Sequence, residues 1–508
     1  MTKRVVSLFL PSWSTDRLRR TLGANAPSRD TPLVVIGHEG RRRVVLAADQ
    51  AARHAGLKPG MVASKAQALV ANLILRDAEP EADLLALERL ATWMQRHYAP
   101  VVAVDPPAGL MLDATGVAHL FGGETDMLRE MIRRLAEVGI AARIAIAPSY
   151  GAAFAAARTI AAPLLVLDDD KLIDTLAPLP IAALRLSAEI VAALKQLGFE
   201  RIGELNTTPR APLALRFGSS IGVRLDQAYG RISEPFDPIV PRDMPNVRRN
   251  FAEPIGAPET IARYTGKLVE QLAGLLETKG LGARRLDLLF FRVDNRIESI
   301  RVGTAKPVRD VKRLTKLLCD KIETIDPGFG IETMTLTAVV AEPLQYRPSP
   351  SSLHDPAAPD VSGLIDTLSN RIGDTQLYRL APVESDLPER AVKRLAPLAP
   401  ATGASWPPHW PRPPRLLDPP ERIEAMALLP DHPPAAFTWR GRRRRVVNAD
   451  GPERVFGEWW RADAERNAVR DYFQIEDESG ERFWLFRAGD GEDPATGSHH
   501  WFLHGIFA

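Results

Sequence analysis

Residues 109–124, which read GLMLDATGVAHLFGGE, carry the strongest folding signal in this chain. An apolar run ends at Asp113, and Thr115-Gly116 then marks a turn. A second apolar run lies at 101–104, and Asp105-Pro106-Pro107 between the two runs is typical of a turn. The stretch therefore predicts two neighbouring strands joined by a short connection.

Strands and helices are predicted to alternate on both sides of this hairpin. Apolar runs at 5–10, 32–37, 43–48 and 141–147 predict buried strands, and helical patterning covers 15–22, 81–97, 126–138 and 151–160. Such alternation predicts a sheet covered by helices. Farther along, residues 171–240 are predicted to be helical with short turns. Residues 245–345 predict a helix at 259–279, strands at 283–293 and 299–304, a helix at 308–325 and a strand at 332–342, which is an α+β pattern.

Length and composition indicate several domains. At about 100–200 residues per domain, 508 residues correspond to about three to five. Sixteen of the 43 prolines lie between Pro343 and Pro420, which predicts a linker with short ordered pieces. Seven of the nine tryptophans follow residue 400, so we expect a small separate domain with an aromatic core at 421–508.

The charge balance and the cysteine content narrow the class of protein. Lys+Arg is 65 and Asp+Glu is 63, and 45% of residues are hydrophobic, which excludes a mostly disordered chain, a collagen-like chain and a disulfide scaffold. The single Cys319 cannot form an intramolecular disulfide, so we expect a reducing, cytoplasmic compartment. No apolar run reaches about 18 residues, and the first one stops at Pro11, so neither a membrane span nor a signal peptide is predicted.

Several stretches together resemble the ImuB family, which are catalytically degenerate, UmuC/DinB-like relatives of the Y-family translesion DNA polymerases. They are residues 4–20 (RVVSLFLPSWSTDRLRR), 44–61 (VVLAADQAARHAGLKPGM), 109–124, 139–158 (GIAARIAIAPSYGAAFAAAR), 197–218 (LGFERIGELNTTPRAPLALRFG), 379–392 and the tail from 470. The resemblance implies a multi-domain α/β protein. Its expected parts are palm and fingers at 1–170, a helical thumb with a helix–hairpin–helix-like segment at 171–240, an α+β little finger at 241–345, a Pro-rich linker at 346–420 and an ImuB-type C-terminal module at 421–508.

The resemblance also places the metal-ligand positions of the polymerase family. Nucleotidyl transfer uses two divalent cations held by carboxylates. The family positions fall at Leu10, Ala108 and Gly109, and the next family Asp falls at Ser12. Because Leu, Ala and Gly side chains cannot ligate a metal, we expect a pseudo-polymerase without a catalytic metal or cofactor. One alternative stays open, in which Asp105 and Asp113 hold Mg²⁺ in an active, low-processivity, error-prone DNA polymerase. In the structural interpretation, Asp105 starts a turn and Asp113 is a strand-end or capping residue.

Two further family features are altered in this sequence. Arg53 matches a phosphate-binding Arg, but Gln50 stands where the family has a phosphate-contacting Tyr. Arg53 is therefore either a phosphate-binding remnant or an ion-paired helix residue. In the helix–hairpin–helix-like segment Gly198 and Gly203 remain, and their backbone N–H groups could hold DNA phosphates. Gly198 could equally end a helix.

The segment from Arg242 to Lys316 is the strongest candidate for a DNA surface. It holds 16 Lys/Arg against 9 Asp/Glu, and its strands alternate charged with apolar residues. Either it binds primer–template DNA without sequence preference or it is a solvated basic face. Likewise, residues 437–445 (FTWRGRRRR) could bind single-stranded DNA, or could be a charge-shielded edge strand with Trp439 in a core. The candidate phosphate contacts are Arg248, Arg249, Arg292, Arg296, Arg301, Lys306 and Arg309.

A polymerase fold without catalysis is most useful as an adaptor. The resemblance implies three partners, which are the sliding clamp, a RecA-like protein of the ImuA type and an error-prone C-family DNA polymerase. A degenerate clamp-binding peptide could include Gln345 and Leu353, and Gln376 begins a second weak match, although an ordinary linker explains both. A protein-only interaction hub is the remaining alternative. The histidines, including His119 and the pair His499-His500, show no metal-ligand spacing with cysteine.

Overall fold

The computed structural model describes residues 3–507 except 235, 241–243, 345–359, 374–375, 401–402, 404, 406–411, 428, 430–431 and 462–464. The chain forms two compact units, Met1–Gln376 and Leu377–Ala508, and each is described by itself. Among the described helices, none has both the length and the apolar character that crossing a bilayer requires.

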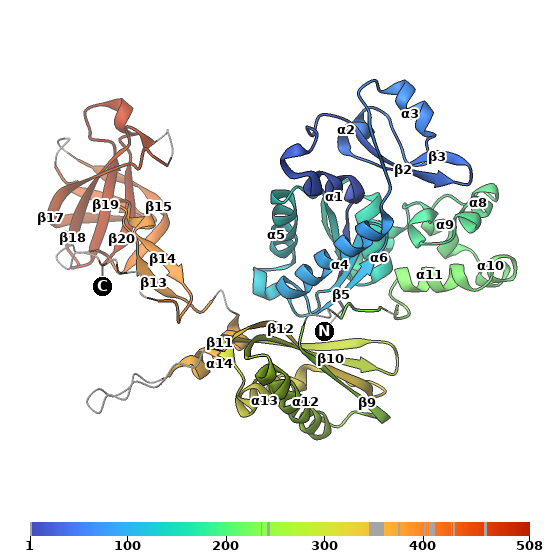
Figure 1. Ribbon diagram of the computed structural model, residues 1–508. Coiled ribbons are helices and arrows are strands. Elements are labelled where there is room, and N and C mark those ends of the chain that lie inside the picture. The colour runs from blue at the N-terminus through green and yellow to red at the C-terminus, as the bar shows by residue number, and fades with distance from the viewer. Residues whose placement is uncertain are drawn as a thin grey trace. The chain divides into compact units, whose positions relative to one another are not determined.

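A five-stranded sheet lies at the centre of the first unit (Figure 1), with the strand order β5-β6-β1-β7-β8. Strand β1 (Val5–Phe9) is antiparallel to both of its neighbours, β6 (Gly109–Asp113) and β7 (Arg143–Ala147). The hairpin predicted from the first quoted stretch is present, because β5 (Val101–Asp105) pairs with β6. The edge strand β8 is Leu164–Val166.

Helices cover both faces of this sheet, which is why its strands are apolar on both sides. Helices α4 (Pro80–His97) and α5 (Glu124–Glu137) pack on one face against alternate residues of β1 and β6. Helix α6 (Tyr150–Thr159) packs on the other face, where its small side chains allow a close approach to β1. The expected sheet covered by helices is therefore observed.

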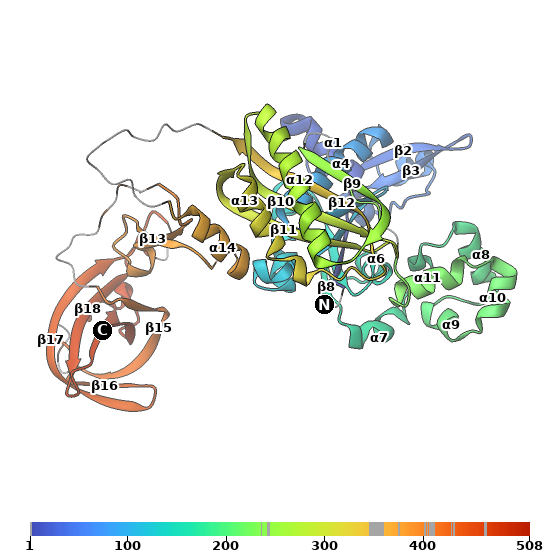
Figure 2. The same cartoon turned by 90° about the horizontal axis from the view of Figure 1, so that it is seen from below.

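A smaller sheet has the order β3-β2-β4, with β2 at Leu33–Glu39, β3 at Arg42–Ala48 and β4 at Ile74–Asp77. It packs on α2 (Gln50–His54) and α3 (Ala63–Leu69), while α1 (Trp13–Leu22) follows β1. Residues 172–228 are helical with short turns, as predicted. Figure 2 shows α8–α11 gathered in one group. Their bounds are α7 Leu172–Leu176, α8 Ala188–Gln196, α9 Ile202–Thr207, α10 Arg210–Phe217 and α11 Ser220–Ala228.

A four-stranded antiparallel sheet completes the first unit, with the order β11-β10-β12-β9. Helices α12 (Pro258–Thr278) and α13 (Val311–Cys319) lie side by side on one face of it (Figure 1). The predicted helix at 308–325 is shorter because β11 continues to Val308 and Asp310 caps the start of α13. Strand β9 was not predicted, since charged residues and Pro254 obscure its pattern. The strands are β9 Asn246–Ile255, β10 Leu281–Arg292, β11 Ile297–Val308 and β12 Ile331–Pro343.

The stretch 346–420, expected to be a linker, contains regular elements. Helix α14 (Ser362–Ile372) belongs to the first unit, while β13 (Arg379–Pro382) pairs with β14 (Val392–Leu395) in the second. Only Pro382 and Pro388 lie between residues 360 and 395, so the average composition concealed a stretch that can fold. Gln345 and Leu353, the proposed clamp peptide, lie outside the described residues.

The second unit contains a closed barrel of six strands, β15 to β20, with adjacent strands paired in chain order. Aromatic side chains fill its interior, among them Phe437, Phe473, Phe483 and Trp501. The long strand β17 curves around the barrel in Figure 2. The strands are β15 Arg415–Met426, β16 Ala436–Trp439, β17 Arg442–Phe456, β18 Val469–Asp477, β19 Arg482–Ala488 and β20 Trp501–Ile506.

Candidate active site and nucleic-acid interface

The three positions assigned to metal ligands meet at the end of β1 and the start of β6. Phe9 lies opposite Gly109 in the sheet, and the Leu10 N–H donates to the Ala108 carbonyl oxygen at 2.9 Å. Leu10 is fully buried in the core that α4 and α5 form, and Ala108 packs at the margin of the same core. These positions are therefore neighbours, but their side chains offer no oxygen to a cation.

The nearby carboxylate of Asp105 is already engaged. Asp105 Oδ2 accepts a hydrogen bond from Arg158 Nη2 at 2.6 Å, and Arg158 Nη1 lies 3.3 Å from Ser7 Oγ. Burial lowers the pKa of Arg158 to about 10, although Asp105 acts in the opposite direction. Sequence reasoning missed Arg158. The available signal was one long cation in a helix made of small residues, GAAFAAAR.

Asp113 is held in a different place. Its Oδ1 accepts the Thr115 N–H at 3.0 Å, the turn role that its sequence suggested. Asp105 lies opposite Gly109, and Asp113 is four residues farther along β6, so the two backbone positions are separated by about 13 Å along the strand direction at about 3.3 Å per residue. Paired catalytic cations lie only about 3.5–4 Å apart. Among the described residues no cluster of three His, Cys, Asp or Glu could hold a metal, and the residues here do not fit a two-metal site.

Other predicted phosphate contacts are engaged inside the fold. Arg53 donates to the Pro11 carbonyl oxygen at 3.1 Å and to Ser12 Oγ at 2.7 Å. The Gly198 N–H donates to the Lys195 carbonyl oxygen, so this glycine ends α8. The Gly203 N–H donates to the Ala177 carbonyl oxygen at 2.9 Å, and a Cβ on Gly203 would lie 3.0 Å from the Ala177 Cβ. Neither glycine N–H is free for a phosphate in this conformation.

The basic residues of the four-stranded sheet divide into buried and accessible ones. Arg292 is buried and pairs with Asp294 and Asp326. Arg301 pairs at 2.6 Å with Asp287, which is 1% exposed, and also donates to the Gln95 carbonyl oxygen at the end of α4. Both arginines therefore form ion pairs within the first unit.

The remaining predicted contacts are more accessible. Arg248 is exposed and donates to Asn250 Oδ1, while Arg249 points to the helix-covered face and lies over the Tyr264 ring. Neither has an ion pair within the described part of the chain. Three others have carboxylate partners, which are Asp294 for Arg296 at 3.5 Å, Asp360 for Lys306 at 3.3 Å and Glu277 for Arg309 at 3.1 Å.

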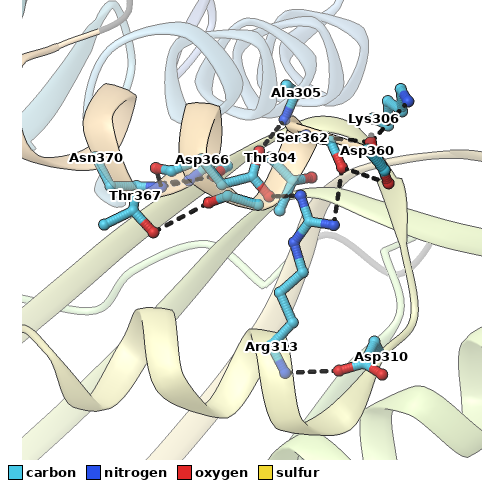
Figure 3. A network of polar contacts seen from close by, with 12 residues as sticks. Thr304, Ala305, Lys306, Asp310, Arg313, Asp360, Ser362, Asp366, Thr367 and Asn370 are labelled. Carbon is cyan, nitrogen blue, oxygen red and sulfur yellow. Dashed lines mark hydrogen bonds and ion pairs between the residues drawn. The ribbon is translucent and has the colours of Figure 1, made fainter. Parts of the chain in front are cut away.

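Helix α14 covers the free edge of β11 with polar side chains (Figure 3). Asn370 accepts from the Gly303 N–H at 2.9 Å and donates to the Gly303 carbonyl oxygen at 2.7 Å, as a paired strand would. Asp366 accepts from the Ala305 N–H at 2.6 Å and forms an ion pair with Arg313. Sequence reasoning did not anticipate this contact.

The basic segment 437–445 lies in the barrel wall. Trp439 is half-buried against the core, donates to Glu421 at 2.7 Å and lies edge-on to Phe483. Arg444 is buried and paired with Asp477, whereas Arg442, Arg443 and Arg445 are exposed. This arrangement favours the alternative in which Trp439 belongs to a core.

Comparisons with known proteins assign the family. The impB/mucB/samB family matches residues 22–158, and a domain of unknown function (DUF6504) matches residues 420–508. Protein ImuB of Caulobacter vibrioides is 44% identical over 462 residues, which are 89% of this chain and 100% of that relative. The chain belongs to the ImuB family.

More distant similarities are to polymerases. DNA polymerase IV of Shewanella oneidensis is 25% identical over 252 residues, or 48% of this chain and 69% of that protein. The crystal structure of DinB from Sulfolobus solfataricus matches at 16% identity and a TM-score of 0.39, covering 66% of this chain and 98% of that one. The matches to the impB/mucB/samB family and to Protein ImuB assign to this ImuB-family chain a Y-family polymerase-like fold of mixed α/β content, as the resemblance predicted.

Proposed function

We propose that this ImuB homologue is a non-catalytic, DNA-binding adaptor in damage-induced, error-prone translesion synthesis. In this proposal residues 1–170 are palm and fingers, 171–240 a thumb and 241–345 a little finger, and the barrel is the C-terminal module. The β1–β6 junction is the observation that supports this proposal. There the positions Leu10, Ala108 and Gly109 come together and present no metal ligand, and Asp105 is hydrogen-bonded to Arg158.

Primer extension tests the catalytic part of the proposal. Without carboxylates at the junction, the site cannot neutralise a triphosphate or stabilise the charge that develops in phosphoryl transfer. We expect no extension of a primer–template by the wild-type chain with Mg²⁺ or Mn²⁺. Extension that Asp105→Ala or Asp113→Ala abolishes would establish the active polymerase instead.

DNA binding is proposed to use the accessible cations of the four-stranded sheet. Arg248 and Arg296 are exposed, and neither is buried in an ion pair as Arg292 and Arg301 are. Contacts to phosphates are independent of sequence, and each one contributes about one unit to the slope of log K against log salt. The sliding clamp, a RecA-like ImuA-type protein and an error-prone C-family polymerase are the proposed protein partners.

The matched test compares Arg248→Glu/Arg296→Glu with Arg129→Glu, an exposed arginine on α5. We expect the double variant to weaken binding to primer–template DNA and to reduce the salt slope by about two, while Arg129→Glu has little effect. Equal affinity of all three chains would remove this basic surface from the proposal and favour the protein-only hub.

A further inference from the structure

Arg158 contacts the groups that surround the metal-ligand positions. It comes from the last turn of α6, and its guanidinium reaches over β1 to Asp105 at 2.6 Å and Ser7 Oγ at 3.3 Å. Only 18% of its side chain is exposed, and 19% of that of Asp105. The pair is therefore an internal contact between α6 and the end of β5.

The guanidinium also fills the space of a side chain at position 109. A Cβ built on Gly109 would lie 2.7 Å from Arg158 Nη2, 3.0 Å from Asp105 Oδ2 and 3.1 Å from the Leu8 carbonyl oxygen. A residue with a side chain at 109 would have to displace Arg158. The absence of a side chain at position 109 therefore leaves the space that the guanidinium of Arg158 occupies.

Aromatic rings fix the guanidinium in this place. Its central carbon lies 3.7 Å from the centre of the Phe154 ring and 4.7 Å from that of Phe9. Cations over ring faces are attracted by the ring quadrupole, and guanidinium groups stack there readily. Because Phe154 is one turn before Arg158 on α6, the helix itself holds the cation against Asp105.

We infer that Arg158 is the built-in counter-cation of the β1–β6 junction, neutralising Asp105 and occupying the room that a ligand at position 109 would need. Divalent cations are then excluded twice, by the loss of ligands and by the gain of a fixed positive charge. This inference rests on the non-catalytic function proposed above. It adds that a carboxylate at position 109 does not by itself create a metal site with Asp105.

The test adds a carboxylate at position 109 with and without Arg158, because Gly109 faces Arg158 and Asp105 whereas Leu10 and Ala108 pack in the core on the other face of the sheet. The variants are Gly109→Glu, the same chain with Arg158→Ala, and the same chain with Arg185→Ala as a control. Arg185 lies over the same Phe154 ring but pairs with Glu234 rather than Asp105. The loss of the electron paramagnetic resonance signal of free Mn²⁺ measures binding.

We expect Gly109→Glu and its Arg185→Ala control to bind Mn²⁺ as weakly as the wild type, and Gly109→Glu/Arg158→Ala to bind Mn²⁺ at least ten times more tightly. Equally tight binding by Gly109→Glu with Arg158 intact would overturn the inference and leave the proposed function standing. Tight Mn²⁺ binding by the wild-type chain at this junction would instead overturn the proposed function.

A second measurement needs no added carboxylate, in case Gly109→Glu unfolds the junction. Arg158→Met and Asp105→Asn are compared singly and together by thermal unfolding. We expect each single change to lower the midpoint and the double variant to recover part of the loss, because it leaves neither charge unpaired. Additive losses would show that the two groups are not coupled and would overturn the inference.

Discussion

Arg301 stabilises the fold through a buried ion pair. Its partner Asp287 is 1% exposed, and removing one member of such a pair leaves a charge without compensation. We expect Arg301→Ala to lower the free energy of unfolding by about 3–5 kcal/mol, and Lys306→Ala, whose pair is exposed, by at most about 1 kcal/mol. Urea unfolding measures both losses. Equal losses would show that the Arg301–Asp287 pair contributes no more to stability than an exposed ion pair does.

His504 gives the barrel a dependence on pH. The side chain is fully buried, and its Nδ1 is hydrogen-bonded to the Tyr472 hydroxyl at 2.8 Å. Burial lowers the pKa of His504 to about 4. Glu389 and Asp418 raise the pKa against this effect, and the positive charge of Arg470 acts in the same direction as burial. An unfolded histidine has a pKa of about 6.5, so between about pH 6.5 and 4 the unfolded chain binds the extra proton.

We therefore expect the barrel to lose up to about 3 kcal/mol of stability as the pH falls from about 6.5 to 4, with no further loss from this group below that range. Tryptophan fluorescence in urea at each pH measures the change. His504→Gln should flatten the dependence, while the exposed His500→Gln should leave it intact. A pH profile that His504→Gln does not alter would contradict this assignment.

Helix α14 shows why an element can be invisible to hydrophobic periodicity. Three of its inward residues, Ser362, Asp366 and Asn370, are polar and spaced by four, while Leu364 and Ile372 are apolar and exposed and Ile365 is the buried apolar residue. Apolar periodicity assumes that the buried face is the apolar one. The partners of α14 are backbone groups of an edge strand, which polar side chains satisfy better.

The elements with continuous apolar runs or ordinary amphipathic helices were predictable, including β1, β6, α4 and α12. The positions Leu10, Ala108 and Gly109 were implied by the family resemblance, and only the structure shows that they meet at the β1–β6 junction. Arg158 could not be predicted, because its meaning depends on a tertiary approach of α6 to Gly109. The ion pairs of Arg292 and Arg301 could not be predicted for the same reason, since a sequence does not show which cations lie beside carboxylates in the folded chain.

Removing the α14 contact should expose the edge of β11. Asp366→Ala takes away the acceptor of the Ala305 N–H and the partner of Arg313. We expect hydrogen exchange at Gly303 and Ala305 to accelerate at least tenfold, since an opening that costs about 1.4 kcal/mol less is ten times more populated. Thr367→Ala is the control, because its hydroxyl donates to Gly363 within the helix. Unchanged exchange in Asp366→Ala would show that α14 does not protect this edge.

The two units have separate cores, which makes their unfolding separable. Helices α1 to α14, the α-helices of the described residues, lie in the first unit, and the barrel core is built from residues of the second. Seven of the nine tryptophans also belong to the second unit. Circular dichroism at 222 nm therefore follows mainly the first unit, and tryptophan fluorescence follows mainly the second.

We expect the two signals to give different thermal midpoints in the full chain, because probes coincide only when unfolding is a single two-state transition. Residues 377–508 expressed alone should unfold with the midpoint that fluorescence reports in the full chain. Primer–template DNA should raise only the helical midpoint if its contacts lie on the four-stranded sheet, since a ligand stabilises the unit that it binds. Coincident midpoints that DNA shifts together would mean that the units unfold as one and that the barrel shares the DNA site.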